Sequence, residues 1–368
     1  MNTVNGLFKS IISKENILNA IQTAAKGKRK KRTVMRTLER AEETAKHLST
    51  ALANGTWRPP AIHQIKEIND GINRKKREIV CPHFVEEQVV HHAIMNVCKP
   101  VFMKKFYRYS CASIPGRGVE YALKYIRKVK KDKRNTKYFV TLDIKSFFNT
   151  IRPSKVFHQL RRMIRDKHTL SLIARILRAN KVQRNSEIVK RGVPIGFFTS
   201  PWMANVLLTP LDNLIKQNVK YYIRYNDDML LFSSNKRKLK RTASEIESYL
   251  HSIGLKLKAA PQIHLFDKNK IRYIGATISR DKTVLAPKIF LKAKRTAKRI
   301  SRKERMTAYD AKRLLSYAGR FKHLDTRNAY YKYIAVVSVR KCRAIISRQA
   351  RRKNDVGKKL QQRKAARK

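Results

Sequence analysis

Residues 223–232 read Ile-Arg-Tyr-Asn-Asp-Asp-Met-Leu-Leu-Phe, a polar core with apolar residues on both sides. The β-branched, aromatic and aliphatic residues of the flanks predict two buried strands. Asn226 and Asp227 tolerate the backbone angles of a tight turn, so we expect a hairpin. The adjacent carboxylates of Asp227 and Asp228 repel each other, which favours a cation beside them. A divalent metal with oxygen ligands, such as magnesium, meets that need; a surface hairpin with a polar turn is the alternative.

The composition indicates a nucleic-acid partner. The chain has 368 residues, enough for two or three domains, and its 86 Lys and Arg outnumber 25 Asp and Glu to give a formal net charge of +61. No run of about 18 apolar residues is present, and the N-terminus is too polar for a secretory signal, so we expect no membrane association. The four cysteines form no Cys-x-x-Cys pair, which favours buried thiols in a cytoplasmic protein.

A second acid ends another predicted strand. Residues 138–143 read Tyr-Phe-Val-Thr-Leu-Asp, and a turn with two aromatic residues follows. Asp143 could instead cap a helix. Together with Asp227 and Asp228, however, it would give three carboxylates from two central strands. Such a set can hold two magnesium ions for in-line phosphoryl transfer.

Two basic stretches are candidates for phosphate contacts. The run 26–32 reads Lys-Gly-Lys-Arg-Lys-Lys-Arg and is suited to follow a nucleic-acid backbone, although a solvated loop would look the same. A hairpin is predicted over 62–81, and its cations at 74–77 are well placed to hold a triphosphate. An ordinary basic turn is the alternative there.

Two loops contain glycines that let the backbone approach a ligand or another chain. One is Ser-Ile-Pro-Gly-Arg-Gly-Val at 113–119, which is weak evidence alone. The other, at 191–201, opens onto an apolar helix whose start could lie along a nucleotide or template strand. A plain connection between a strand and a helix would look similar.

The order of the predicted elements gives the fold class. Residues 1–55 are predicted to be helical. Strands and helices then alternate as β-α-β-β-α-β around the acids, which predicts an α+β fold with an antiparallel sheet backed by helices. The chain is predicted to be helical again from residue 288. The tail 340–368 carries 13 Lys and Arg against one Asp, so we expect a fraying helix or a disordered arm that binds RNA, or a solvated extension without a role.

These stretches, in this order, resemble the motifs of bacterial reverse transcriptases. Residues 141–148 resemble the first catalytic motif, and residues 193–207 resemble the Pro-x-Gly-x-x-x-Ser-Pro loop with its following Ala-Asn helix. Tyr-Asn-Asp-Asp at 225–228 resembles the Tyr-x-Asp-Asp box, and 254–257 and 273–275 resemble two later palm motifs. The Lys expected after the first of these two motifs is displaced, which leaves the acid on the pyrophosphate side unnamed.

The resemblance implies a right-hand polymerase that copies a template RNA into DNA. Its expected domains are a helical basic extension (1–55), fingers and palm (56–285), a helical thumb (286–340) and a basic tail (341–368). The expected partners are template RNA, an RNA/DNA hybrid and dNTPs, and the expected cofactor is two Mg²⁺ ions.

The resemblance also implies roles for individual residues. The expected catalytic and metal-binding set is Asp143, Asp227 and Asp228 with the carbonyl of Ile144. Phe148 matches the steric gate that rejects a ribose 2′-hydroxyl. The expected nucleotide-binding residues are Lys75, Arg77, Phe148, Ile195 and Gly196. The expected nucleic-acid-binding residues are Lys28, Arg29, Lys30, Arg117, Tyr225 and Arg320.

Within the family the chain is most similar to the reverse transcriptases of diversity-generating retroelements. Ile195 stands where most relatives carry Gln, and the Gly-Arg-Gly segment, the stretch 316–328 and the compact size fit that group. This implies low fidelity opposite template adenine and an accessory variability-determinant protein as a partner. Phe197 and Pro201 depart from the group's Asn and Gln. Antiphage-defence and group II intron reverse transcriptases are alternatives, as is a non-catalytic RNA-binding protein on the same scaffold.

Overall fold

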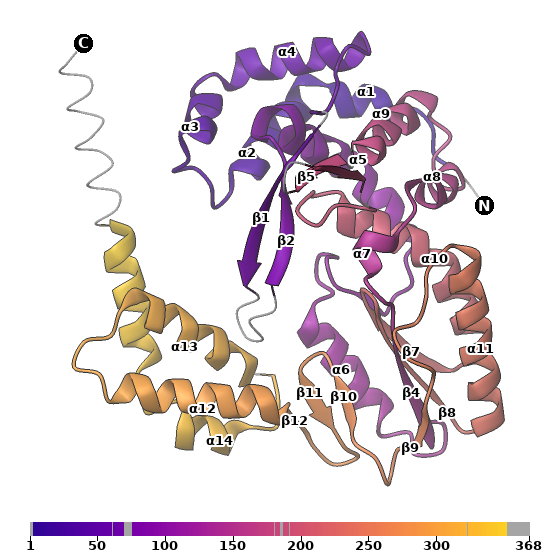
Figure 1. Cartoon of the computed structure of the whole chain (residues 1–368), viewed down its shortest axis with the longest axis vertical. Helices are drawn as coiled ribbons and strands as arrows, with labels where there is room; N and C mark the ends of the chain where they lie inside the picture. The colour runs from indigo at the N-terminus through magenta and orange to yellow at the C-terminus, as the bar shows by residue number, and fades with distance from the viewer. Residues whose placement is uncertain are drawn as a thin grey trace. The chain divides into compact units, whose positions relative to one another are not determined.

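The computed structural model of the chain describes two compact units (Figure 1). Unit 1 is Met1–His264 and unit 2 is Leu265–Lys368. The described residues are 3–60, 62–69, 76–179, 181–184, 187–190, 192–321 and 323–351. Lys75 and the tail from residue 352 onward lie outside them. The domain boundaries expected at 55/56, 285/286 and 340/341 stay predictions.

Unit 1 begins with helices, as expected. Two of its apolar positions, Ile17 and Ile21, are buried on one face of the second helix, which packs against a helix later in the chain (α5). The side chain of Ser13 accepts a hydrogen bond from the backbone N–H of Asn16 and so caps that second helix. The four helices are α1 (Leu7–Ile12), α2 (Lys14–Ala25), α3 (Arg32–Glu39) and α4 (Ala41–Ala53).

The hairpin predicted over 62–81 is present. Strands β1 (Gln64–Asn69) and β2 (Lys76–Cys81) pair antiparallel, with Gln64 opposite Cys81. A helix follows the hairpin: it starts with the π-helical turn η1 (Phe84–Val89) and continues as α5 (Val90–Lys105).

A five-stranded sheet carries the two acid-bearing stretches. Its strand order is β3-β7-β8-β4-β9, and β4 and β7 both pair antiparallel with β8. The short β3 pairs parallel with β7 at one edge. The sheet is therefore mixed, whereas a wholly antiparallel sheet was expected. Most residues of β7 and β8 are buried, and most of the buried ones are apolar, because this part of the sheet is covered. The strands are β3 (Ser110–Cys111), β4 (Tyr138–Asp143), β7 (Tyr221–Tyr225), β8 (Asp228–Ser233) and β9 (Ile263–Leu265).

Helices back this sheet, as predicted. The long apolar helix α10 contacts β7, and α11 contacts β4 and β8 (Figure 1). The remaining helices of unit 1, with these two, are α6 (Val119–Val129), α7 (Phe147–Thr150), α8 (Pro153–Arg161), α9 (Lys167–Arg178), α10 (Ser200–Asn218) and α11 (Lys236–Ser252). A separate pair of strands, β5 (Lys181–Arg184) and β6 (Glu187–Lys190), precedes α10.

Unit 2 combines a small sheet with helices. Its first two strands are joined by a tight turn, because Ile274 and Gly275, within the motif at 273–275, both have positive φ. The sheet consists of β10 (Ile271–Tyr273), β11 (Ala276–Ile278) and β12 (Thr283–Leu285). The helices are α12 (Pro287–Ser301), α13 (Ala308–Phe321) and α14 (Arg327–Tyr333), and 339–351 is also helical.

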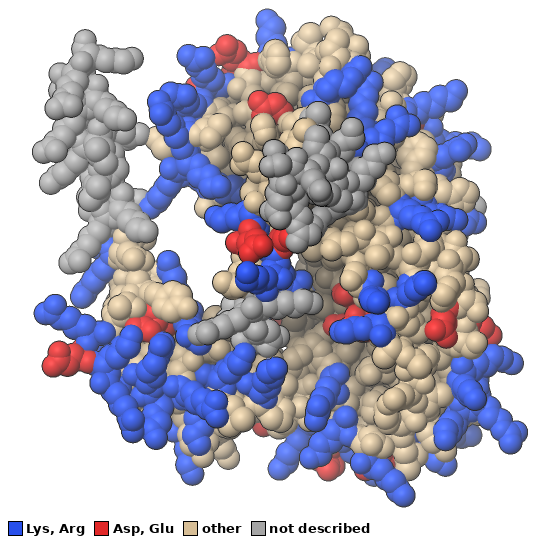
Figure 2. Space-filling model, in the orientation of Figure 1, with Lys and Arg blue, Asp and Glu red and all other residues tan. Residues whose placement is uncertain are grey.

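The surface agrees with the composition. Lys and Arg side chains cover much of the visible face of each unit, and Asp and Glu are scattered among them (Figure 2). Cys98, Cys111 and Cys342 are buried, and Cys81 is partly buried, so the prediction of buried thiols holds for three of four. In the part of the chain that the structure describes, no helix has the length and apolar character needed to cross a membrane.

Candidate active site

The three predicted acids lie at neighbouring ends of two central strands. Asp143 is the last residue of β4 and Asp228 is the first residue of β8, and the two are register partners. Directly opposed residues on adjacent strands present their side chains on the same face. Asp227 lies in the turn between β7 and β8, where Asn226 has a φ of 54°. The predicted hairpin is therefore confirmed, and Asn226 supplies the left-handed backbone conformation that it needs.

The carboxylates strongly affect one another. Burial, together with the charges of Asp227 and Asp143, raises the pKa of Asp228 to about 6, while Lys258 opposes the shift. Burial also raises the pKa of Asp227, with the charge of Asp143 acting in the same direction. Negative charge is thus crowded at this end of the sheet, and an additional cation would be stabilised there.

One cation already contacts the acids. The Lys258 ammonium Nζ lies 2.6 Å from Oδ2 of Asp143, and the Lys258 backbone N–H donates to the Asp143 carbonyl at 2.8 Å. The contact raises the pKa of Lys258. Sequence reasoning missed this residue because it took the lysine expected after 254–257 to be displaced, although Lys258 follows that motif directly. The signal available was that 254–258 could run alongside the end of β4.

Ile144 lies between these two segments. It forms an antiparallel bridge with Leu257, and the bridge's hydrogen bonds join Lys145 N–H to the Lys256 carbonyl and Lys258 N–H to the Asp143 carbonyl. Those two bonds therefore do not use the carbonyl of Ile144. Its predicted role as a metal ligand stays a prediction.

The donor chemistry of this site suits Mg²⁺. Three carboxylates offer the hard oxygen donors that this ion prefers, and burial, with the charges of the neighbouring acids, raises the pKa of Asp227 and Asp228, a shift that a bound cation would oppose. Within the described residues, however, no three His, Cys, Asp or Glu side chains stand close enough together to hold a metal. The three acids lie at adjoining strand ends, and Lys258 contacts one of them, Asp143.

The hairpin of β1 and β2, which we call the fingers hairpin, is joined to the loop at 192–199. The Val80 N–H of β2 donates to the Ile195 carbonyl at 2.7 Å. At Gly196, where φ is 122°, an added Cβ would lie 2.1 Å from the Val80 carbonyl oxygen, so only glycine allows this approach. Arg77, on the same strand, lowers the pKa of Asp227, which places its charge within electrostatic reach of the acid turn. The structure thus joins Ile195 and Gly196 to β2, the strand that carries Arg77, and the charge of Arg77 acts on Asp227.

The same loop packs against the segment that follows Asp143. The Val193 N–H donates to the Phe148 carbonyl at 2.9 Å, and an added Cβ on Gly192 would lie 2.5 Å from that carbonyl oxygen. Phe148 is half-buried, and its ring centroid lies 5.4 Å from that of Phe147. The predicted steric gate therefore lies on the loop side of the acids.

Phe197, the departure from the expected loop, is a buried anchor. It is 3% exposed, and its ring centroid lies 5.1 Å from that of His63 and 5.0 Å from that of His91. His63 is itself bonded to the buried Glu87, with 2.7 Å between Nε2 and Oε1. An apolar ring fits this packed surrounding better than an amide would, because a buried amide needs hydrogen-bond partners.

The predicted nucleic-acid contacts lie in several places. Lys28 donates to Gln88, Arg29 donates to Gln22 at 2.8 Å, and Arg117 donates to the Tyr107 carbonyl at 3.0 Å. Lys30 is exposed in the same turn as Lys28. Tyr225 is the register partner of Asp228 and so lies at the acids. Arg320 is exposed on α13 in unit 2. These roles stay predictions.

A cavity of about 540 Å³ lies away from all of these residues. It lies between α8 and α9, with Arg161, Lys167, Arg175 and Arg178 around an apolar floor. The Arg175 guanidinium donates hydrogen bonds to the carbonyls of Gly55 and Trp57. This arginine of the cavity wall therefore helps to fix the end of the N-terminal helices.

Comparison with known families agrees with this geometry. The family described as "Reverse transcriptase (RNA-dependent DNA polymerase)" matches residues 53–278, which include all three acids, the loop and the fingers hairpin. The chain belongs to the reverse transcriptase family. Unit 1 supplies nearly all of the matched segment, and the match ends with β11 in unit 2.

Several curated proteins are similar to this reverse transcriptase over part of its length. The group II intron-encoded protein LtrA of Lactococcus lactis is 27% identical over 179 residues, which are 48% of this chain and 29% of that protein. Protein YkfC of Escherichia coli is 23% identical over 148 residues, 39% of each chain. A putative COX1/OXI3 intron 1 protein of Saccharomyces cerevisiae is 24% identical over 138 residues, 37% of this chain and 16% of that protein. The chain thus spans less than half of these relatives.

A solved structure supports the fold. The apo telomerase of Candida tropicalis superposes with a TM-score of 0.52 at 12% identity, covering 76% of this chain and 57% of that one. This likeness concerns the fold alone, and it confirms the predicted α+β polymerase architecture.

Proposed function

We propose that this protein is an RNA-directed DNA polymerase that copies a template RNA into DNA. The observation that carries the proposal is the register pair Asp143 and Asp228, with Asp227 in the adjacent turn, inside a segment that matches the reverse transcriptase family. The raised pKa of Asp228 and the high positive charge of the chain support it.

The acids would hold two Mg²⁺ ions. Asp143, Asp227 and Asp228 would be the ligands, together with the carbonyl of Ile144. When bound, such ions lower the pKa of a primer 3′-hydroxyl and neutralise charge on the leaving pyrophosphate. Lys258 would release Oδ2 of Asp143 as the metal site forms, since both cations need the same oxygen.

The incoming dNTP would lie between the fingers hairpin and the acids. Arg77, with Lys75 beside it in sequence, would hold the triphosphate, because a guanidinium forms paired hydrogen bonds with phosphate oxygens. Ile195 and Gly196 would pack against the nucleotide, and Phe148 would exclude a 2′-hydroxyl. The hydrogen bond between Val80 and Ile195 supports this arrangement because it ties the two sides together.

The remaining predicted contacts would bind the template and the RNA/DNA hybrid. Basic residues provide the sequence-independent attraction to phosphates. The residues we assign to this role are Lys28, Arg29, Lys30, Arg117, Tyr225 and Arg320. We also propose that the protein acts in the cytoplasm of a bacterial or phage-infected bacterial cell, where RNA and dNTPs are available.

A primer-extension assay on an RNA template tests the function. We expect incorporation of dNTPs that depends on Mg²⁺ or Mn²⁺, and we expect Asp227→Asn to abolish it while leaving RNA affinity unchanged. Persistence of polymerisation in Asp227→Asn would show that the metal assignment is wrong. RNA binding without incorporation by the intact chain would instead favour a non-catalytic RNA-binding protein.

We further propose that the enzyme is error-prone at template adenine and serves a diversity-generating retroelement. Ile195 supports this proposal, because an aliphatic side chain at this point of the loop provides no polar contact to check the geometry of the nascent base pair. An accessory variability-determinant protein would then be a partner. An error rate at adenine that stays unchanged in Ile195→Gln would contradict the link between this residue and fidelity.

A group II intron role is the second candidate, because several of the similar proteins are intron-encoded. An antiphage-defence role is a further alternative. The neighbouring genome sequence separates them: a variable gene with a near-copy repeat indicates diversification, flanking intron sequence indicates a group II intron, and a lone operon indicates defence.

A further inference from the structure

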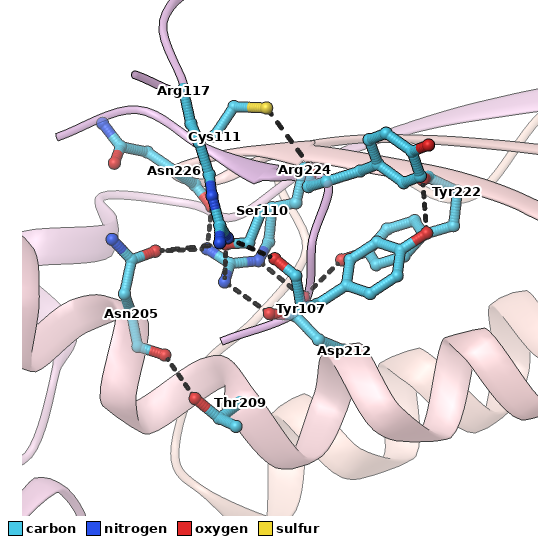
Figure 3. Close-up of polar contacts among 11 residues, drawn as sticks. Tyr107, Ser110, Cys111, Arg117, Asn205, Thr209, Asp212, Tyr222, Arg224 and Asn226 are labelled. Atoms are coloured by element: carbon cyan, nitrogen blue, oxygen red, sulfur yellow. Dashed lines mark hydrogen bonds and ion pairs between the residues drawn. The ribbon is translucent and has the colours of Figure 1, made fainter. Parts of the chain in front are cut away.

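A buried arginine lies directly beneath the turn that carries the acids (Figure 3). Arg224 is on β7, two residues before Asn226, and its side chain is fully buried. It faces Asp212 of α10 in a two-pronged ion pair: Nε lies 2.8 Å from Oδ1, and NH2 lies 2.6 Å from Oδ2. The Tyr222 hydroxyl donates to the same Oδ1 at 2.8 Å.

The guanidinium uses all of its donors. Beyond the two bonds to Asp212, NH2 donates to Oγ of Ser110 at 2.7 Å, and NH1 donates to Oδ1 of Asn205 at 3.0 Å. The second NH1 bond goes to the backbone carbonyl of Asn226, also at 3.0 Å. A guanidinium has five N–H donors, so these five acceptors satisfy it completely. Because every donor of this buried charge is used, its hydrogen bonds hold the guanidinium in a single position relative to β3, β7 and α10.

One of these five acceptors belongs to the acid turn. Asn226 has a positive φ of 54°, a conformation that costs free energy for a residue with a side chain unless the surroundings hold it. The bond from Arg224 holds its carbonyl, and Asp227 and Asp228 follow at once in sequence. The positions of both carboxylates therefore depend on the buried ion pair of Arg224 and Asp212.

We propose that Arg224 is a positioning residue for the metal-binding acids. Its hydrogen bond fixes the Asn226 carbonyl from the buried side of the turn. It thereby holds Asp227 and Asp228 in the position in which they face Asp143. This inference rests on the proposed function and deepens it. Lysine cannot replace arginine here, because an ammonium has three donors around one point and cannot span Asp212 and Asn226 together.

Three variants separate this role from a general contribution to stability. Arg224→Lys keeps a charge opposite Asp212 but loses the fork. The double variant Arg224→Met with Asp212→Leu removes both charges, so no unpaired charge stays in the core, and the turn still loses its support. Tyr222→Phe is the matched control, because it removes one hydrogen bond to Asp212 on the side away from the turn.

The decisive measurement is equilibrium binding of Mn²⁺ to the full chain without nucleic acid, followed by electron paramagnetic resonance. We expect Arg224→Lys and the double variant to bind Mn²⁺ about 10- to 100-fold more weakly, as when other supports of metal ligands are lost. In primer extension we expect kcat to fall about 100-fold, with the KM for dNTP and the affinity for RNA close to wild type. Tyr222→Phe should lower Tm and leave Mn²⁺ binding unchanged.

The outcomes are distinct. Folded arginine variants with wild-type Mn²⁺ affinity and kcat overturn the inference, and so does a Tyr222→Phe variant that weakens Mn²⁺ binding as much as Arg224→Lys does. If Arg224→Lys does not fold, the double variant decides. A wild-type chain that neither binds Mn²⁺ nor extends a primer contradicts the proposed function itself, whereas the failure of the arginine variants alone leaves that function intact.

Discussion

At the scale of single residues, Lys258 and Asp143 form a contact that metal binding must change. The ammonium lies 2.6 Å from an oxygen that the proposed metal site requires. The Lys258 side chain is 67% exposed and that of Asp143 is 33% exposed, so water screens the pair. Such a pair contributes at most about 1 kcal/mol, which makes the lysine a weak competitor that a divalent ion can displace.

Removing this competitor should strengthen metal binding. We expect Lys258→Met to lower the Mn²⁺ concentration at half-saturation by up to about fivefold, the equivalent of about 1 kcal/mol. Lys256→Met is the control, because it removes an equal charge from an exposed residue of the same segment. The measurement is equilibrium Mn²⁺ binding at constant ionic strength. Equal effects of the two variants would indicate a general charge effect rather than competition for Asp143.

A second residue, His91, makes the stability of the protein depend on pH. Its ring is fully buried, and neither nitrogen has a hydrogen-bond partner in the described part of the chain. Burial lowers its pKa from 6.5 to about 3, and the nearby His92 and His63 act in the same direction. Glu87, a buried acid in η1 just before α5, is bonded to His63. His91 is therefore neutral when the protein is folded.

The sign of the pH dependence follows from this shift. The unfolded chain takes up a proton on His91 near pH 6.5, and the folded chain does so only near pH 3, so acid favours unfolding between these values. Stability falls through this range by up to about 1.4 kcal/mol for each pH unit. We expect His91→Leu to reduce that slope and to change stability little at pH 7.5. Urea unfolding at several pH values measures both, and an unchanged slope would contradict the assignment.

At the scale of elements, the loop and the fingers strand depend on one glycine. The approach of Val80 to Ile195 places the backbone of β2 against Gly196, with no room for a side chain. This contact connects Arg77 on β2 to the loop that leads into α10. The geometry of the proposed nucleotide site therefore depends on backbone packing between elements more than 100 residues apart.

A methyl group at this position should separate the two elements. We expect Gly196→Ala to raise the KM for dNTP about tenfold or more and to lower Tm, because an added Cβ would lie 2.1 Å from the Val80 oxygen. Gly6→Ala is the matched control: Gly6 also has a positive φ, 72°, but nothing lies within 4 Å of its Cβ position. Steady-state kinetics and thermal unfolding are the readouts. Similar losses in both variants would assign the effect to backbone strain alone.

At the scale of the whole molecule, charge dominates. A formal net charge of +61 makes phosphate contacts the main source of RNA affinity, and each contact releases counterions from the RNA. The charge is spread over both units (Figure 2). Binding should therefore be strong at low salt and show little dependence on RNA sequence.

We expect RNA affinity to fall about 1,000-fold or more between 50 and 200 mM salt, since about six or more phosphate contacts produce a loss of this size. Removal of residues 352–368 should reduce the slope of log Kd against log salt concentration, because it removes basic residues of the tail that is expected to bind RNA. Fluorescence anisotropy with a labelled RNA measures both. A slope that is unchanged by the truncation would show that the tail does not contact phosphates.

The sequence by itself determined the acid-bearing hairpin, the strand that ends on Asp143 and the α+β class. Each of these depends on local chemistry: apolar runs form strands, Asn226 accepts a positive φ, and alternating elements build a covered sheet. The family resemblance came from the same short motifs, and the family match over 53–278 confirmed it.

Only the tertiary structure decided which distant residues meet. Lys258 reaches Asp143, Val80 reaches Ile195, and Arg224 joins Asp212 to the acid turn, although each pair is far apart in the chain or on a different element. Periodicity cannot predict such contacts, because it reports which face of an element is buried and not what lies across from it. The sequence predicts that the acids need support from cations, and the fold decides which cations supply it.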